Sequence, residues 1–233
     1  MIDKVTTIEE AMACLKSGDT VLIAGFGSSG QPHSLLKYLA AMPVDHLTAV
    51  SEDMSYSTDR EEKRLFPELI TEGKISHLMV SFLGRHVHVQ ERIADGSLTY
   101  ELIPQGTLAE RLRAGGAGIG GLYLKTGVGT IVEEGKEKRI IDGEEYILEK
   151  PIKGDVALLK CFRADRMGNA VFRYAALNFN LVMAMAGKTV ILEADEIVEP
   201  GELEPDQIHV PGVLVDYVVQ NTYGPDFGLP EEV

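Results

Sequence analysis

The sequence contains no tryptophan and only two cysteines among its 233 residues. Cys14 and Cys161 are far apart and belong to no Cys-x-x-Cys pair, so neither a disulfide framework nor a cysteine-based zinc site is expected. Long apolar runs are also missing, since stretches such as Leu181–Ala186 are far shorter than the ~20 residues that span a bilayer. The first residues lack the apolar segment of a signal peptide. These absences predict a cytoplasmic protein without membrane association.

Positive charge is scarce as well. The chain has 22 lysines and arginines against 36 aspartates and glutamates, a formal net charge of −14. Such an acidic chain repels phosphate backbones, so we expect no nucleic-acid partner. The six histidines are scattered, and His86 and His88 would share a face only in a strand, where we predict the start of a helix. No metal site is therefore predicted.

Apolar and amphipathic segments alternate along the chain. Continuous apolar, β-branched runs predict strands, and segments of helical spacing lie between the first four of them. The predicted strands are 20–24, 47–51, 77–82, 99–103, 156–161, 189–193 and 213–219, and the predicted helices are 7–15, one from Pro32 onward, 64–72, 87–94 and 107–113. Thr7 with Glu10, and Thr107 with Glu110, have the spacing of capping boxes. This order predicts an α/β fold with a largely parallel open sheet flanked by helices.

An antiparallel hairpin is predicted inside this pattern. Two short strand-like segments, 138–141 and 145–148, flank Asp142-Gly143, which is typical of a type I′ turn. We predict one domain over residues 1–220, with this hairpin as an insert, and a loose C-terminal tail over 221–233.

A glycine-rich loop follows the first predicted strand. The stretch Gly25–Gly30 fits Gly-x-Gly-x-x-Gly, and Glu52 or Asp53 stands at the distance where a dinucleotide-binding fold places its ribose-binding acid. Pro32 argues against this interpretation, because dinucleotide folds usually continue a closely packed helix there. A plain turn is the remaining alternative.

The same loop also resembles a known family. Residues 18–26, followed by Gly30 and Pro32, contain Gly-Phe-x-x-x-Gly-x-Pro, with Ala24 in place of a more usual glycine. Further blocks follow in order at 104–118, 126–130 with 133–136, 163–169, 178–180 and 208–212. Together they resemble the A (alpha) subunit of family I CoA-transferases over residues 1–220. The resemblance implies the CoA-transferase-like fold.

The resemblance also implies a reaction and a partner. Such enzymes move coenzyme A from an acyl-CoA to a free carboxylate by a ping-pong mechanism through a glutamyl-CoA thioester. The nucleophilic glutamate lies in a Ser-Glu-Asn-Gly block of the B (beta) subunit, and this chain has only Ser51-Glu52-Asp53-Met54. We therefore expect no catalytic nucleophile here, no permanently bound cofactor, coenzyme A as a substrate, and a beta subunit in an α2β2 or larger assembly.

Several residues acquire candidate roles from this resemblance. Gln105 is expected to bind the substrate carboxylate or carbonyl, or else to cap the helix at Thr107. Glu52 is a surface or strand-end carboxylate, a wall of the acyl pocket, or a displaced nucleophile. Arg85 is a clamp for a second substrate carboxylate, or a surface ion-pair residue. The residues expected on the coenzyme or acyl side are Ala24, Gly25, Phe26, Gly27, Ser28, Ser29 and Gly30, and the interface or oxyanion candidates are Gly115, Gly116 and Gly118.

Two other functions compete with this interpretation. One is an NAD-dependent oxidoreductase that uses the Gly25–Gly30 loop, and the other is an effector-binding regulatory chain on the same fold. The sequence does not distinguish acetate, acetoacetate, butyrate and 3-oxoadipate as the carboxylic acid that the enzyme uses.

Overall fold

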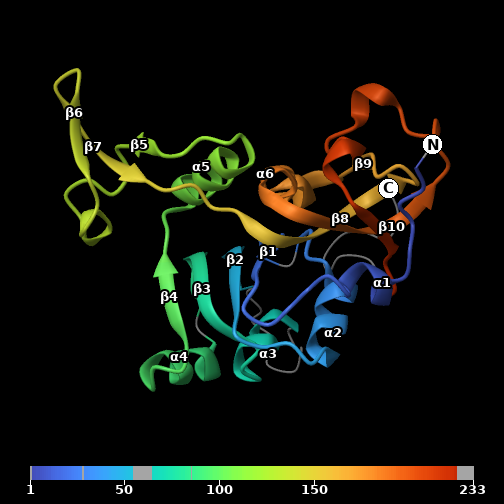
Figure 1. The fold of residues 1–233 in the computed structure, drawn as a ribbon, viewed down its shortest axis with the longest axis horizontal. Helices are drawn as coiled ribbons and strands as arrows, with labels where there is room; N and C mark the ends of the chain where they lie inside the picture. Colours follow the sequence, from blue (N-terminus) through green and yellow to red (C-terminus); the bar gives the residue numbers. More distant parts are fainter. Residues whose placement is uncertain (1, 28, 55–64, 85, 225–233) are drawn as a thin grey trace.

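The structure is a computed structural model that describes residues 2–27, 29–54, 65–84 and 86–224. Its main sheet has seven parallel strands in the order β11-β10-β8-β1-β2-β3-β4, and the short strand β9 (Ala170–Val171) pairs antiparallel with β8. The parallel strands are β1 (Thr20–Ile23), β2 (Leu47–Asp53), β3 (Ile75–Phe82), β4 (Thr99–Leu102), β8 (Gly154–Asp165), β10 (Gly187–Val198) and β11 (Tyr217–Gln220). The predicted parallel α/β fold is confirmed (Figure 1).

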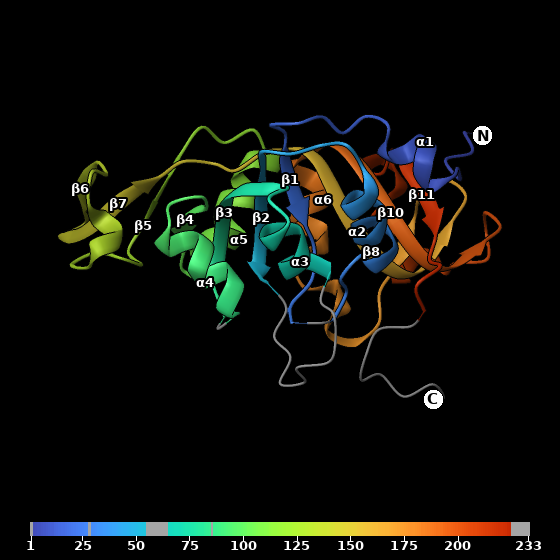
Figure 2. The same cartoon turned by 90° about the horizontal axis from the view of Figure 1, so that it is seen from below.

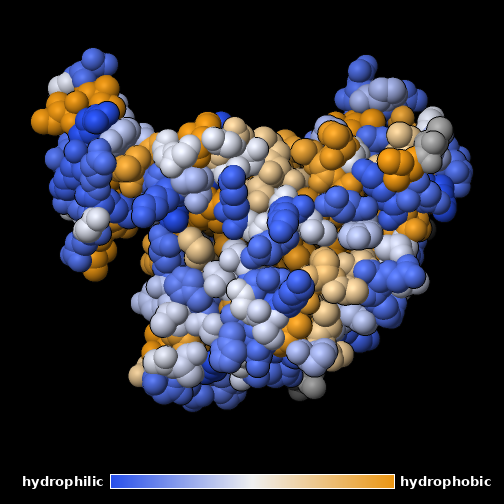
Figure 3. All heavy atoms as spheres, in the orientation of Figure 1, coloured by the Kyte–Doolittle hydropathy of each residue, from blue (hydrophilic) through white to orange (hydrophobic). Residues whose placement is uncertain are grey.

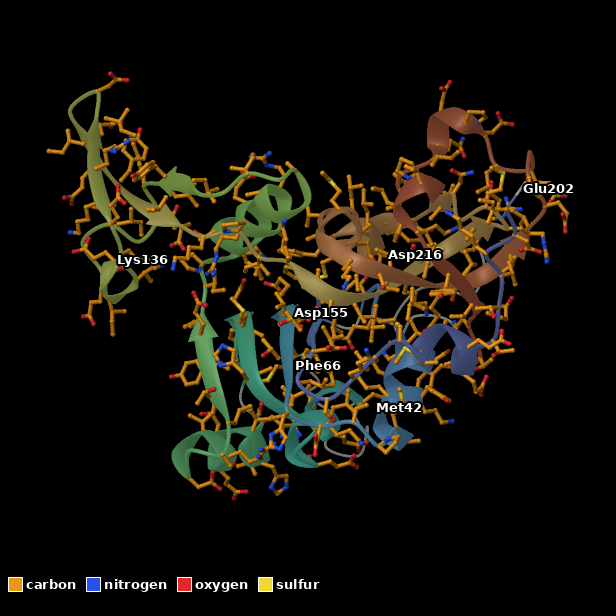
Figure 4. The ribbon with its side chains drawn as sticks, in the orientation of Figure 1. Met42, Phe66, Lys136, Asp155, Glu202 and Asp216 are labelled. Carbon is orange, nitrogen blue, oxygen red and sulfur yellow. The ribbon has the colours of Figure 1, made fainter. Side chains whose placement is uncertain are left out.

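Helices cover both faces of this sheet (Figure 2). One face carries α1 (Ile8–Met12), α2 (His33–Ala41), α3 (Leu65–Thr71) and α4 (Val87–Ala94), which share an apolar core with the sheet. Phe66 of α3 is fully buried in that core (Figure 4). The other face carries α5 (Gln105–Gly116) and α6 (Asn180–Ala186), around a second core that includes Leu108, Leu112 and Met183. Because the central strand β1 is covered on both sides, its sequence from Val21 to Ile23 is continuously apolar.

A small antiparallel sheet stands out from the main body (Figures 1 and 3). It consists of β5 (Leu122–Leu124), β7 (Glu144–Glu149) and β6 (Lys138–Ile141), in that order. Asp142 and Gly143 at its turn both have positive φ angles, 51° and 81°, so the predicted type I′ hairpin is confirmed. Lys136, labelled in Figure 4, pairs with the buried carboxylate of Glu149 at 2.5 Å.

Some predicted boundaries are wrong. Thr7 caps α1 as expected, accepting a hydrogen bond from the Glu10 N–H at 3.2 Å, but the helix ends at Met12 and not at residue 15. The second capping box is absent, because Pro104 is the N-cap of α5 and Thr107 is buried inside the helix. Strand β11 begins at residue 217, since 212–214 form a 3₁₀ helix. Helix α6 was missed because its short run of apolar residues does not distinguish a buried helix from other core packing.

The predicted loose tail begins with four anchored residues. The Asn221 amide oxygen accepts a hydrogen bond from the Ser34 hydroxyl at 2.8 Å, and the Tyr223 ring stacks on His33 at 5.1 Å between centroids. Residues 225–233 lie outside the described part of the chain. Among the described residues, no helix is both long and apolar enough to cross a bilayer.

Candidate active site

The glycine-rich loop lies at the carboxyl edge of the parallel sheet. It follows β1, and Leu22 of β1 is in register with Val50 of β2, which brings Ala24 and Glu52 to the same edge. Figure 2 shows β1 and β2 ending side by side there. Ligands of open α/β sheets bind outside this edge, so the fold places the loop where a site is expected.

The loop is a tight turn closed by its own backbone. Phe26 and Ser29 exchange two backbone hydrogen bonds, of 3.0 and 3.1 Å. Gly25, Gly27 and Gly30 all have positive φ angles, of 130°, 60° and 70°. A Cβ on Gly30 would lie 2.7 Å from the Ala176 carbonyl oxygen, so this glycine also allows a close backbone approach.

Side chains from two other elements hold the loop in place. The Asp53 carboxylate at the end of β2 accepts a hydrogen bond from the Gly27 N–H at 2.9 Å. On the other side, the Asn178 amide donates to the Ser29 carbonyl oxygen at 3.1 Å. The Phe26 ring is 47% exposed at the tip of the turn. Of the residues expected on the coenzyme side, Ser28 lies outside the described part of the chain.

Glu52 and Gln105 meet beside this loop. The Gln105 amide, at the first residue of α5, donates a 2.9 Å hydrogen bond to the Glu52 carboxyl oxygen. Glu52 does end a strand, but it is only 5% exposed, so the surface interpretation is wrong. Burial raises the pKa of Glu52 from 4.5 to about 7; the Gln105 hydrogen bond opposes this rise, and the neighbouring Asp53 carboxyl adds to it. The site therefore holds a carboxyl group that is partly protonated near neutral pH.

A second buried carboxyl supports the helix that follows the loop. Glu193 of β10 is fully buried and accepts hydrogen bonds from the Ser34 and Leu35 N–H groups at 2.9 and 3.1 Å. Burial raises the pKa of Glu193 to about 7. Lys160 of β8 is also buried and lies 3.2 Å from the Asp195 carboxylate. Sequence reasoning missed these groups, although a charged residue inside an apolar strand run is a signal for them.

Two of the three candidate glycines after residue 113 are closely packed within the chain. Gly115 and Gly116 lie inside α5, where an added Cβ would come within 1.9 Å of the Ile152 carbonyl oxygen and 2.4 Å of the Met185 Cβ. Gly118 follows the helix at a φ of 73°, with open space around it. Close packing of α5 thus accounts for the first two glycines, and the interface or oxyanion role remains a prediction.

The dinucleotide interpretation finds little geometric support. Helix α2 starts three residues after Gly30, and Gly30 packs against residues 176–178. The acid expected to bind a ribose, Glu52, is engaged by an amide. Arg85 lies outside the described residues. No group of three or more metal-binding side chains occurs within the described ranges.

Comparison with known proteins gives matches over nearly the whole chain. A family model described as coenzyme A transferase matches residues 5–221. The A (alpha) chain of a probable succinyl-CoA:3-ketoacid coenzyme A transferase of Bacillus subtilis is 46% identical over 211 residues, covering 91% of this chain and 87% of the relative. The alpha chain of an acetoacetyl-CoA:acetate/butyrate CoA transferase of Clostridium acetobutylicum is 40% identical over 220 residues, covering 94% and 99%.

A solved structure shares the fold. An acyl-CoA transferase from Escherichia coli O157:H7, in a thioester complex with CoA, superimposes with a TM-score of 0.84 at 25% identity. The match covers 97% of this chain but 49% of that one, so this chain spans about half the length of that structure. Because the family model and the relatives cover almost all of the sequence, the chain belongs to the coenzyme A transferase family, as a chain of the alpha type.

Proposed function

We propose that this chain is the alpha subunit of a short-chain acyl-CoA:carboxylate CoA-transferase that works with a homologous beta subunit. The observation that carries the proposal is the coincidence of two findings. The family match runs from residue 5 to residue 221, and the glycine loop and the Gln105–Glu52 pair share one edge of the sheet. The relatives are themselves named as A or alpha subunits, which supports a two-chain enzyme.

In this mechanism the partner chain supplies the attacking glutamate. Its carboxylate attacks the acyl-CoA thioester, CoA thiolate leaves, and a mixed anhydride forms. The thiolate then attacks the glutamyl carbonyl, which releases the first acid and leaves a glutamyl-CoA thioester. The acceptor acid reverses both steps. The thioester bond energy is thereby conserved, provided that water is excluded.

The alpha chain contributes walls and neutral hydrogen-bond donors to this cavity. Gln105 is an amide at a helix start, so it binds a carbonyl or carboxylate oxygen without adding charge. The 24–30 loop forms the coenzyme or acyl side of the cavity. Glu52, held by Gln105, shapes the acyl pocket.

The two neighbouring carboxyls of Glu52 and Asp53 limit which substrates fit the site. Glu52 is 5% exposed and Asp53 is 7% exposed, at the same strand end. A second carboxylate on the substrate would be repelled there, so we infer an acceptor with an uncharged tail, such as a short fatty acid or a 3-oxo acid. A dicarboxylate is the competing choice, and it requires Arg85 to act as a clamp.

Reconstitution of the alpha chain with a beta subunit tests both the shared active site and the proposed class of acceptor. The purified alpha chain alone should show no CoA transfer from acetoacetyl-CoA to acetate, and addition of a beta subunit should restore it. Turnover by the alpha chain alone would contradict the shared site. An acceptor screen of the complex should favour butyrate and acetate over succinate; a preference for succinate that Arg85→Ala abolishes would establish the clamp instead.

A nicotinamide titration addresses the oxidoreductase alternative. We expect no heat of NAD binding to the alpha chain by calorimetry. Saturable NAD binding that Gly27→Val removes would favour that alternative over CoA transfer.

A further inference from the structure

Gln31 is a buried amide at the end of the glycine loop. Its side chain is 2% exposed, and its Nε2 atom has no hydrogen-bond partner among the described residues. This residue precedes Pro32 and was not among the candidate site residues. The sequence offers no pattern that would distinguish it from an ordinary loop glutamine.

The loop is built around this side chain. Gly25, with a φ of 130°, lies so close that a Cβ added to it would be 2.4 Å from the Gln31 Cγ. On the other side, the Gln31 carbonyl oxygen accepts the His33 N–H at 3.0 Å, at the first residue of α2. The hydrogen bond fixes the Gln31 backbone, and Gly25 packs against the start of its side chain, so the residue is held closely on both sides.

An unpaired buried amide is costly. Leaving such a donor without an acceptor destabilises the folded chain, whereas an apolar side chain of the same shape has no such cost. Buried polar groups in folded proteins nearly always have a partner, and the Gln31 Nε2 atom has none among the described residues. An N–H donor at the carboxyl edge of a parallel sheet is placed for an oxygen acceptor on a ligand.

The chemistry of the loop narrows the class of that ligand. A neutral amide binds a carbonyl or carboxylate oxygen and adds no charge near the Glu52 and Asp53 carboxyls. Resting on the proposed function, we propose that Gln31 is a further substrate-binding residue, whose Nε2 donates a hydrogen bond to an acyl or carboxylate oxygen of the substrate. Gln31 directly follows the glycine loop, and Gln105 is the first residue of α5.

The experiment separates stability from activity in the assembled enzyme. Gln31→Met removes the donor and keeps the length of the side chain. Gln90→Met, at an exposed position of α4, is the matched control. Loss of one hydrogen bond predicts a rise in KM for acyl-CoA or acceptor of roughly threefold to tenfold. The urea midpoint of Gln31→Met should equal or exceed that of the wild type, because an unpaired polar group is removed. The control should change neither quantity.

Two results would overturn the inference about Gln31, and a third would refute the proposed function. Equal KM and kcat in Gln31→Met and wild type would overturn the inference, since the amide then meets only water. A lower urea midpoint in both Gln31→Met and Gln31→Leu, or weaker assembly by size-exclusion chromatography, would also overturn it, because the amide would then be structural. An inactive wild-type complex would instead refute the proposed function, and so the two failures are distinguishable.

Discussion

The change Glu52→Gln offers the sharpest test of the buried acid at this site. It replaces the carboxyl by an amide of the same shape, whose oxygen is still available to the Gln105 N–H. The pKa of Glu52 rises from 4.5 to about 7, mainly because the carboxyl is buried. The folded state then holds this proton more tightly than the unfolded state. The contribution of Glu52 to stability is therefore fully present below pH 4.5 and is lost as the pH rises through about 7.

The size of the effect follows from this difference in pKa. A tenfold change in proton affinity corresponds to about 1.4 kcal/mol, so the ionised carboxyl costs at most about 3 kcal/mol above neutral pH. Because the protein relaxes around a buried charge, the effective cost is smaller, and we take about 1–2 kcal/mol. Glu52→Gln removes that cost. The variant should therefore gain about 1 kcal/mol more over wild type near pH ~8.5 than near pH ~5.5.

Urea unfolding of the alpha chain at the two pH values measures this quantity. Glu9→Gln, an exposed acid in the first turn of α1, is the matched control and should show the same small difference at both pH values. If the unfolding free energies of Glu52→Gln and wild type also differ by the same amount at both pH values, Glu52 does not retain its proton on folding.

Three further predictions concern packing and hydrogen bonding around the site, and each is measured by urea unfolding. Gly25→Ala places a Cβ 2.4 Å from the Gln31 Cγ at a φ of 130°, and should cost about 1–3 kcal/mol; no loss would mean that the loop relaxes freely. Gly116→Ala should cost a similar amount, because its Cβ would come within 2.4 Å of α6. Gly106→Ala, in open space in the same helix, should gain up to about 1 kcal/mol of stability. Equal effects of the two substitutions would refute the close packing at Gly116. Glu193→Ala leaves two N–H groups at the start of α2 unpaired and should cost about 2 kcal/mol or more, with partial rescue in Glu193→Gln; full stability in Glu193→Ala would show that other groups satisfy them.

Local signals predicted most of the main sheet and the hairpin. The apolar runs at 20–24 and 47–51 became β1 and β2 within one or two residues, because strands covered on both faces must be continuously apolar. Asp142-Gly143 predicted its turn because few other residue pairs accept two positive φ angles. Thr107 gave a wrong helix start, because Pro104 is the N-cap of α5 and the threonine is buried inside the helix.

The sequence by itself determined the parallel α/β order, the glycine loop and the family, since these depend on local conformational preferences and on blocks of residues in a given order. Only the tertiary structure decided which polar groups meet. Gln105 and Glu52 are 53 residues apart, and their contact exists because α5 begins, and β2 ends, at one edge of the sheet. The burial of Glu52, Glu193 and Gln31 likewise comes from elements distant in the chain. Hydrogen-bond partners and pKa values depend on that three-dimensional environment, which residue identity and spacing alone do not specify.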